Sequence, residues 1–190
     1  MHAQLSLFEA PNSLPDGLCH MPELISVREE ALLIEAMQEL PFKEFEFQGF
    51  LGKRRVVSFG WKYDFNTREL RRTDDIPEFL LGTREAAARF AELPASSLQQ
   101  VLLTEYRPGA SIGWHRDKAV FAQVIGVSLA SSCVLRFRRK SGSAWQRASL
   151  RLAPRSVYLL SEAARTQWEH RIPSLAGLRY SITFRNFREQ

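Results

Sequence analysis

The chain has 190 residues, of which 45% are hydrophobic and 25% are charged. This composition suits one domain with its own core and excludes collagen-like, coiled-coil and wholly disordered chains. The formal charge of +5 permits a nucleic-acid partner without establishing one. Two cysteines without zinc spacing, no apolar run of membrane length and no secretory signal predict a reducing, cytoplasmic setting.

The N-terminal part predicts a leader followed by helices. Residues 1–22 hold three prolines among small residues, so we expect an irregular, flexible leader before a single domain spanning 23–190. Ser26 is a suitable cap for a helix that runs to about Leu40. A second helix is predicted over 83–91.

Strand-length apolar runs separated by turn residues dominate the rest of the chain. Two short strands are expected between the helices and six from residue 100 onward. Their predicted ranges are 45–50, 55–59, 101–106, 124–129, 134–137, 148–152, 157–160 and 180–184. This order predicts an α+β, mainly β fold, in which an antiparallel sandwich or jelly roll is flanked by N-terminal helices.

Three side chains have the chemistry of a metal site. His115 and Asp117 are two residues apart, so on an extended segment both project from one face. His170 would complete a set of two histidines and one carboxylate, which can hold a non-haem Fe(II) and leave positions open. A surface or capping pair is the alternative for His115 and Asp117 alone.

The C-terminal segment from Arg179 to Arg185 alternates strictly between polar and apolar residues. Period two puts Arg179, Ser181, Thr183 and Arg185 on one face of a strand and the apolar residues on the other. Two guanidiniums on an inward face need anions, and a dicarboxylate held against a metal would supply them. The alternative is an amphipathic edge strand with solvated arginines.

At this point the sequence resembles the AlkB-like family of Fe(II)- and 2-oxoglutarate-dependent dioxygenases. The resemblance is carried by TEYRPGASIGWHRD around His115 and Asp117, by WEHRIP around His170 and by RYSITFR at 179–185. It covers a catalytic core of about 100–187 and implies a double-stranded β-helix.

The resemblance also implies roles for individual residues. His115, Asp117 and His170 would bind the iron and be the catalytic residues. Tyr106 and Arg179 would hold 2-oxoglutarate, with Arg179 on its distal carboxylate and Arg185 near the iron-chelating end. The same wall would be lined by Ser181 and Thr183. With Fe(II), 2-oxoglutarate and O2, such enzymes hydroxylate a carbon next to nitrogen and release formaldehyde, succinate and CO2.

Two positions depart from the pattern of the family. Thr104 stands where members often carry Asn, two residues before the tyrosine. Ala119 stands where members that repair methylated adenine and cytosine commonly carry an acidic residue that reads the base edge. The lesion, the base and the kind of strand therefore stay open.

The substrate is expected to be nucleic acid because the 44 residues between Asp117 and Glu162 contain no acid but eight cations. Alternation puts Arg136 and Arg138 on one face of a hairpin, with Arg147 and Arg151 from its second strand. Such a face is a candidate phosphate track, and the alternative is a solvated outer face.

A lid region is expected at about 42–75. Its basic start includes Arg54 and Arg55, and alternate aromatic residues follow, with Trp61 and Tyr63 the candidates for stacking on a flipped base. A buried hairpin that uses these rings as core is the alternative.

The leader contains Gln4-Leu5-Ser6-Leu7-Phe8, which is similar to the peptide by which bacterial replication and repair proteins bind the sliding clamp. This favours DNA repair as the task and alkylated DNA as the partner, with RNA as the other nucleic acid. We expect a monomer with no membrane contact. An oxygenase acting on protein or a small molecule, and a binding module on a degenerate oxygenase scaffold, remain alternatives.

Overall fold

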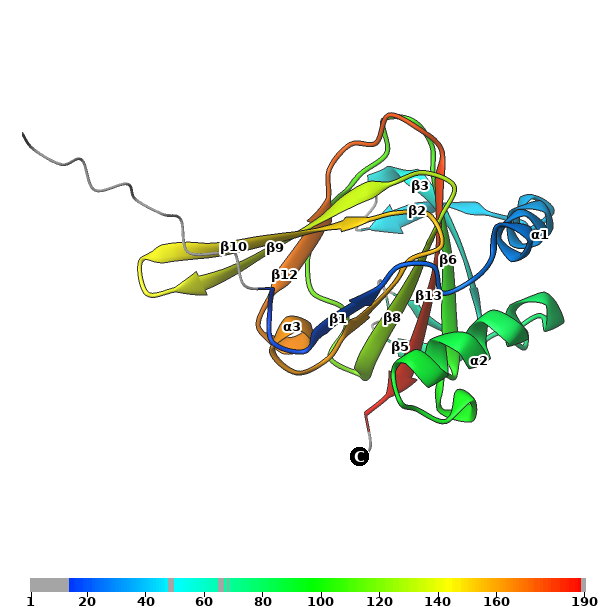
Figure 1. The fold of residues 1–190 in the computed structure, drawn as a ribbon, viewed down its shortest axis with the longest axis horizontal. Coiled ribbons are helices and arrows are strands. Elements are labelled where there is room, and N and C mark those ends of the chain that lie inside the picture. Colours follow the sequence, from blue (N-terminus) through cyan, green and yellow to red (C-terminus); the bar gives the residue numbers. More distant parts are fainter. Residues whose placement is uncertain (1–13, 48–49, 65–66, 68, 189–190) are drawn as a thin grey trace, which may run out of the picture.

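Two facing antiparallel sheets form the molecule. The computed structural model describes residues 14–47, 50–64, 67 and 69–188. The large sheet has seven strands in the order β1-β11-β8-β13-β6-β3-β2, the small one has four in the order β10-β9-β12-β7, and β4 and β5 form a separate hairpin (Figure 1). The strands are β1 (Leu18–Met21), β2 (Lys43–Phe47), β3 (Phe50–Phe59), β4 (Trp61–Asp64), β5 (Glu69–Arg72), β6 (Gln100–Tyr106), β7 (Ile112–His115), β8 (Phe121–Leu129), β9 (Cys133–Ser141), β10 (Ala144–Leu152), β11 (Val157–Leu160), β12 (Glu169–Ile172) and β13 (Arg179–Phe187). This confirms the predicted jelly roll, and its inner space lies between the two sheets.

Two helices, α1 (Val27–Gln38) and α2 (Leu81–Phe90), cover the outer face of the large sheet, and short 3-10 helices lie at Glu78–Leu80 and Ala95–Ser97. The third helix, α3 (Glu162–Thr166), instead packs its Ala164 into the core between the two sheets. Ser26 caps α1 as predicted, in a reciprocal capping box with Glu29. The apolar sides of α1, α2 and the large sheet share one core, which includes Leu33, Met37 and Leu103.

Strand β13 lies at the centre of the large sheet, between β8 and β6. Its alternate apolar residues Tyr180, Ile182 and Phe184 join the core under the helices. The polar residues therefore face the space between the sheets, and they are buried there as well. The expected two-faced strand is confirmed, and its polar face is interior.

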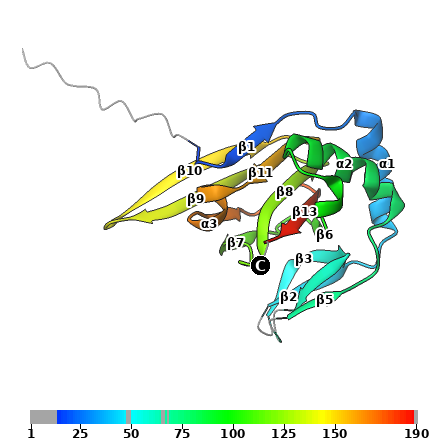
Figure 2. The same ribbon diagram turned by 90° about the horizontal axis from the view of Figure 1, so that it is seen from below.

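The small sheet closes the inner space from the other side. Alternate residues of β9 and β10, among them Leu135, Phe137 and Leu152, are buried in a second core with Tyr106 and Trp168. The β9–β10 hairpin projects beyond the rest of the domain, whereas β2, β3 and β5 lie together at a different end (Figure 2).

Strand β1 corrects the expected boundary of the leader. It lies within residues 1–22, but it pairs with β11 from Leu18 opposite Leu160 to Met21 opposite Val157. The fold thus begins before residue 22, because backbone pairing along a sheet edge does not require an apolar pattern in the added strand. Residues 4–8, the candidate clamp peptide, lie outside the described residues.

The ring alternation expected in the lid is interrupted at Gly60. Phe59 is buried in the core under the helices, whereas Trp61 contacts Phe187. Gly60 has φ of 75°, and a Cβ there would lie 2.1 Å from the Gln99 carbonyl oxygen. The chain turns at this glycine, so residues on either side of it do not continue one strand. Phe65, the last ring of the expected alternation, lies outside the described residues.

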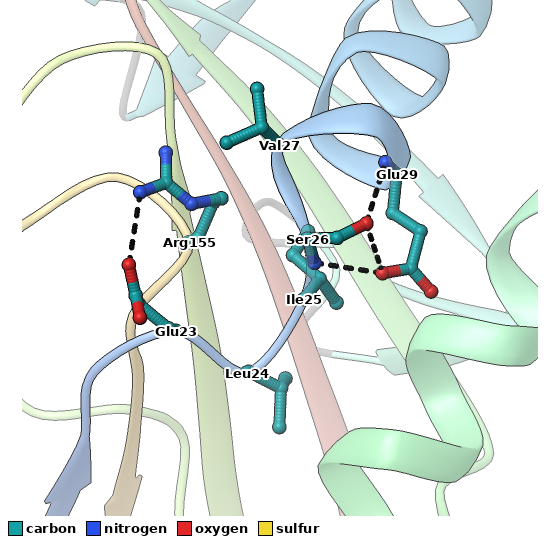
Figure 3. Close-up of a pocket in the computed structure, with 7 residues that line it drawn as sticks. All are labelled: Glu23, Leu24, Ile25, Ser26, Val27, Glu29 and Arg155. Atoms are coloured by element: carbon teal, nitrogen blue, oxygen red, sulfur yellow. Dashed lines mark hydrogen bonds and ion pairs between the residues drawn. The ribbon is translucent and has the colours of Figure 1, made fainter.

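A shallow pocket of about 350 Å³ lies beside the start of α1 (Figure 3). Its polar groups satisfy one another, since Arg155 bonds Glu23 and the Ser26 cap bonds Glu29. Arg155 also reaches Glu30 on α1. The pocket ties the helix to the sheet and holds no set of catalytic groups. None of the helices in the described ranges has the length and apolar character needed to cross a lipid bilayer.

Candidate metal and co-substrate site

Three candidate ligands converge in the space between the sheets. Strands β7 and β12 are antiparallel neighbours, and His115 lies directly opposite His170. Their ring centres are 4.3 Å apart, and Asp117 follows just beyond the end of β7. One nitrogen or oxygen from each of the three residues lies within 4.8 Å of the others. The donor set and this spacing fit a single divalent iron.

Both histidines are prepared to act as ligands. The His115 Nδ1 is 2.9 Å from the Gly113 carbonyl oxygen, which can only accept a hydrogen bond. The proton is therefore assigned to Nδ1, and Nε2 keeps its lone pair. Burial, followed by the influence of His115, lowers the pKa of His170 to about 3, so its ring is neutral near pH 7. A neutral imidazole is the form that binds a metal.

Asp117 is held ionised by its neighbours. Burial raises the pKa of this carboxyl, but the charge of Arg185, joined at acidic pH by the protonated histidines, outweighs burial and holds the pKa well below its usual range. Arg185 donates to Oδ1 from Nε at 3.0 Å and from Nη2 at 2.8 Å. The other oxygen, Oδ2, is 3.5 Å from the His170 Nε2. Oδ2 is thus the oxygen available to a metal.

Arg179 is a buried cation that lacks an anion. Its side chain is only 1% exposed, and its Nε donates to the Ser128 hydroxyl at 3.1 Å. Nη1 is buried without a hydrogen-bond partner, and no acidic side chain of the described ranges forms an ion pair with Arg179. An unpaired buried guanidinium is strongly unfavourable, so the fold leaves room here for an anionic ligand.

Three further candidate co-substrate residues, Tyr106, Ser181 and Thr183, line the inner face of the large sheet with Arg179. The Tyr106 ring centre is 5.1 Å from the Arg179 guanidinium, and Tyr106 lies opposite Arg179 across β6 and β13. Ser181 and Thr183 are buried on the same inner face. The guanidinium and the ligand triad stand at opposite ends of this face, as a dicarboxylate with a metal-chelating end requires. The residues present therefore fit both iron and 2-oxoglutarate.

The β4–β5 hairpin places two of the lid candidates beside the triad segment. The Lys118 ammonium, directly after Asp117, lies 4.8 Å from the Tyr63 ring centre. Trp61 packs edge-on against Phe187 with ring centres 5.6 Å apart, and Phe187 stacks on Phe121. The Arg185 guanidinium contacts Phe121 in turn.

The two lid arginines point to opposite faces of β3. Arg54 lies opposite Tyr106 and stacks on Phe45 at 3.8 Å, on the inner side. Arg55 instead forms a bidentate ion pair with Glu105 on the other side, with N–O distances of 2.8 and 2.7 Å. Adjacent strand residues alternate, so the two cannot share one surface. Arg55, expected to contact the substrate, is thus paired with Glu105 of the same sheet.

The expected basic face of the β9–β10 hairpin continues across the small sheet. Arg138 lies opposite Arg147, and Arg171 of β12 lies opposite Arg136. The outward cations of this sheet are Arg136, Arg138, Lys140, Arg147, Arg151 and Arg171. Glu169 is the only acid in the four strands, and it pairs with Arg138 at 2.6 Å.

Two tryptophans interrupt this basic face. The Arg138 guanidinium lies 4.5 Å from the ring centres of both Trp114 and Trp145, and Trp145 is 41% exposed. Arg171 lies 4.9 Å from Trp114. Exposed indole beside guanidinium is the combination on which single-stranded bases stack.

Several residues of the site were not found from the sequence. Gln100 accepts from the Arg185 Nη1 at 2.9 Å, and Ser128 holds Arg179. Arg165 of α3 donates from its Nη2 to the carbonyl oxygens of Lys118 and Phe121, which fixes the loop after Asp117. Tyr158 of β11 faces the same inner space. Each comes from an element that the metal pattern does not include, so no local signal in the sequence identifies it.

Comparisons with known proteins agree with this geometry. The family model described as the 2OG-Fe(II) oxygenase superfamily matches residues 17–185. The "Alkylated DNA repair protein ALKBH8 homolog" of Arabidopsis thaliana is 30% identical over 193 aligned positions, covering 89% of this chain and 54% of that protein. The "tRNA (carboxymethyluridine(34)-5-O)-methyltransferase ALKBH8" of Macaca fascicularis is 26% identical, covering 94% of this chain and 32% of that protein. The chain thus spans about half or less of the length of these relatives.

A solved structure of OsALKBH1 has the same fold. It superposes with a TM-score of 0.69 over 92% of this chain and 98% of that one, at 17% identity.

Proposed function

Because the chain belongs to the 2OG-Fe(II) oxygenase superfamily and is one of its AlkB-like enzymes, we propose that it removes methyl groups from nucleic-acid bases by oxidation. The co-substrates of the family are 2-oxoglutarate and O2, and the metal is Fe(II). The main support for a nucleic-acid substrate is a surface with six outward cations and a single acid. It lies on the sheet whose inner face holds His115 and His170.

The residues of the chain have separate tasks in this reaction. His115, Asp117 and His170 would hold the iron, which supplies the oxidation of a C–H bond when 2-oxoglutarate and O2 are bound. Arg185 fixes the Asp117 carboxylate so that one oxygen is free to coordinate. Arg179, Tyr106, Ser181 and Thr183 would bind the co-substrate, and their burial excludes bulk water from its distal end.

On a methylated base, both oxygen atoms of O2 are used. One oxygen atom of O2 enters succinate as 2-oxoglutarate loses CO2, and the other enters the N-methyl group as a hydroxyl. The resulting hemiaminal breaks at its C–N bond and releases formaldehyde, while the nitrogen recovers a proton. The protein's part is to hold the methyl group beside the metal, which is a matter of positioning.

The lid residues suit a base turned out of its strand. Tyr63 lies against Lys118, next to a metal ligand, and offers a ring near the site where a base would enter. Arg54, on the inner side of β3, would add a positive charge for a flanking phosphate. A base must leave its stack to reach a buried metal, and aromatic stacking offsets part of that cost.

DNA is the strand that we propose, with repair of alkylated DNA as the task. The Arabidopsis relative is named for alkylated DNA repair, and RNA is the alternative because the macaque relative is named for tRNA modification. Formaldehyde release should be measured on single-stranded DNA and RNA of one sequence, each carrying the same N-methylated base. Faster turnover of the DNA supports repair, whereas turnover of the RNA alone contradicts it.

The basic surface is tested by removing charge. Changing Arg147→Gln together with Arg151→Gln should weaken binding of methylated single-stranded DNA and flatten its salt dependence, by about 0.7 in log–log slope for each phosphate that is no longer neutralised. The matched control is Arg28→Gln with Arg89→Gln, two exposed arginines on the helices. Equal effects of the two pairs would mean that the surface acts only through net charge, and would refute a phosphate track.

We also propose that Gln4 to Phe8 binds a bacterial sliding clamp through Leu7 and Phe8. Calorimetric titration of the full chain with a bacterial clamp should show binding that Leu7→Ala with Phe8→Ala abolishes. Binding that survives this change contradicts the proposed peptide. The cytoplasmic location and the monomeric state stay predictions.

A further inference from the structure

A tyrosine that the metal pattern does not include occupies the inner space beside the co-substrate residues. Tyr158 is 8% exposed and belongs to the same buried cluster as Tyr106, between the two sheets. Its strand, β11, is separated from β13 only by β8. The side chain faces the cavity side of the sheet, because its neighbours Val157 and Leu159 belong to the core under the helices.

Gly126 makes room for this ring. Tyr158 lies opposite Gly126 on β8, which in turn lies opposite Thr183 on β13. A Cβ at Gly126 would be 2.3 Å from the ring carbons Cε1 and Cζ of Tyr158 and 2.5 Å from its hydroxyl oxygen. The ring therefore lies across β8, with its hydroxyl directed from β11 toward β13.

The register places this hydroxyl between the two ends of the expected co-substrate. Along the inner face of β8, Ser128 binds the Arg179 Nε, and Val124 lies opposite Arg185, which holds Asp117. Gly126 is midway, about 7 Å along the strand from each, from the rise per residue. The Arg179 Nη1 is buried without a hydrogen-bond partner. No side-chain hydrogen bond from a described residue influences the Tyr158 hydroxyl.

We propose that the Tyr158 hydroxyl and Arg179 together donate hydrogen bonds to the distal carboxylate of 2-oxoglutarate. The proposal rests on the assignment of Arg179 to that carboxylate. It explains why a large polar ring is admitted here by a glycine, and it gives the Tyr158 hydroxyl an acceptor. Hydrogen bonds to a charged group are stronger than neutral ones, so this donor contributes to co-substrate affinity.

The phenol stays protonated throughout the physiological range. Burial raises the pKa of Tyr158 strongly, and the positive charge of Arg179 only partly opposes this shift. The group is therefore a donor at every working pH. Its buried cluster with Tyr106, whose ring centre lies 5.1 Å from the Arg179 guanidinium, places it on the side of the cavity that holds the distal carboxylate.

The test is equilibrium binding of 2-oxoglutarate to the Mn(II)-loaded protein, measured by titration calorimetry. Tyr158→Phe removes only the hydroxyl and should raise the Kd about tenfold or more, the size expected for one hydrogen bond to a charged group. Tyr180→Phe is the matched control, since Tyr180 is also buried but faces the helices and donates to Glu105. It should leave the Kd unchanged.

A second ligand identifies which end of the co-substrate is bound. In 2-oxopentanoate a methyl group replaces the distal carboxylate, so Tyr158→Phe should not change its affinity. An equal loss for both ligands, or no loss for 2-oxoglutarate, overturns the proposal and leaves Tyr158 as a packing residue. Arg179→Gln tests the assignment on which the proposal rests. If this variant leaves the Kd of 2-oxoglutarate unchanged, Arg179 does not bind the distal carboxylate, whatever the result for Tyr158→Phe.

Discussion

Glu105 is expected to stabilise the large sheet by joining β3 of the lid region to β13, which carries Arg179, and Glu105→Gln should therefore destabilise the protein. The Glu105 side chain is 6% exposed, and it accepts from Arg55, from the Arg107 Nε at 2.8 Å and from the Tyr180 hydroxyl at 3.2 Å. Glu105 lies on β6, Arg55 on β3 and Tyr180 on β13. One carboxylate thus joins three adjacent strands of the large sheet, directly behind Tyr106 and Arg179.

The magnitude follows from what Gln can and cannot replace. Breaking a buried ion pair costs about 3–5 kcal/mol when the remaining charge is trapped. Here Arg55 and Arg107 are 31% and 59% exposed, so both can turn to water. The Tyr180 hydroxyl can accept from the new amide. We therefore expect Glu105→Gln to lower the free energy of unfolding by about 2 kcal/mol, below the trapped-charge range.

The destabilisation caused by Glu105→Gln should decrease as the pH falls. Hydrogen bonding by Arg55 lowers the pKa of Glu105 below its usual value of 4.5, although burial opposes the shift. A depressed folded-state pKa contributes stability that is present above the unfolded pKa and is lost as the pH falls through the folded one. The difference between wild type and Glu105→Gln should be complete at pH 7 and disappear at pH values below the folded pKa.

Urea unfolding at pH 7 and at acidic pH measures this difference. Glu69→Gln is the control, because the Glu69–Arg71 pair is more than half exposed and should contribute less than about 1 kcal/mol. A Glu105→Gln effect as small as that of the control, or one that does not change with pH, would refute the reasoning.

Further predictions concern the inner space. Gly126→Ala places a Cβ 2.3 Å from the Tyr158 ring and should lower the free energy of unfolding by about 1–3 kcal/mol. Gly82→Ala is the control and should not destabilise the protein, because no atom lies within 4 Å of the added Cβ. Chemical denaturation of the two variants measures the difference. Asp117→Asn should lower Mn(II) affinity at least about tenfold, because the ligand loses its charge; retention of wild-type affinity in a metal titration would exclude Asp117 as a ligand. Arg165→Met should increase hydrogen exchange of the amides in residues 118–121, since the anchor of their carbonyl groups is removed; unchanged exchange would contradict that role.

The sequence identified features that depend on local periodicity. Strict alternation in β13 predicted that Arg179 and Arg185 share a face, and the spacing of His115 and Asp117 predicted that their side chains project to the same side. Ser26, the capping residue of α1, was also predicted from neighbouring residues alone. These signals were sufficient for the fold class and, together with His170, for the candidate metal-binding set.

Other features depend on contacts between distant segments. Strand β1 exists because β11 offers it an edge, and Tyr158 enters the cavity because Gly126 lies opposite it. Arg54 and Arg55 were grouped as neighbours in sequence, although a strand sends them to opposite faces. The register between strands decides each of these cases, and no single segment encodes that register.

Mass spectrometry of a methylated oligonucleotide tests the central claim most directly. The anaerobically loaded Fe(II) protein, supplied with 2-oxoglutarate and O2, should convert an N-methylated single strand to a product lighter by one methylene group, with equal amounts of formaldehyde and succinate. Asp117→Asn should give no conversion. Succinate formation without any mass change in DNA or RNA would show that the oxygenase acts on another class of substrate, and would contradict the account.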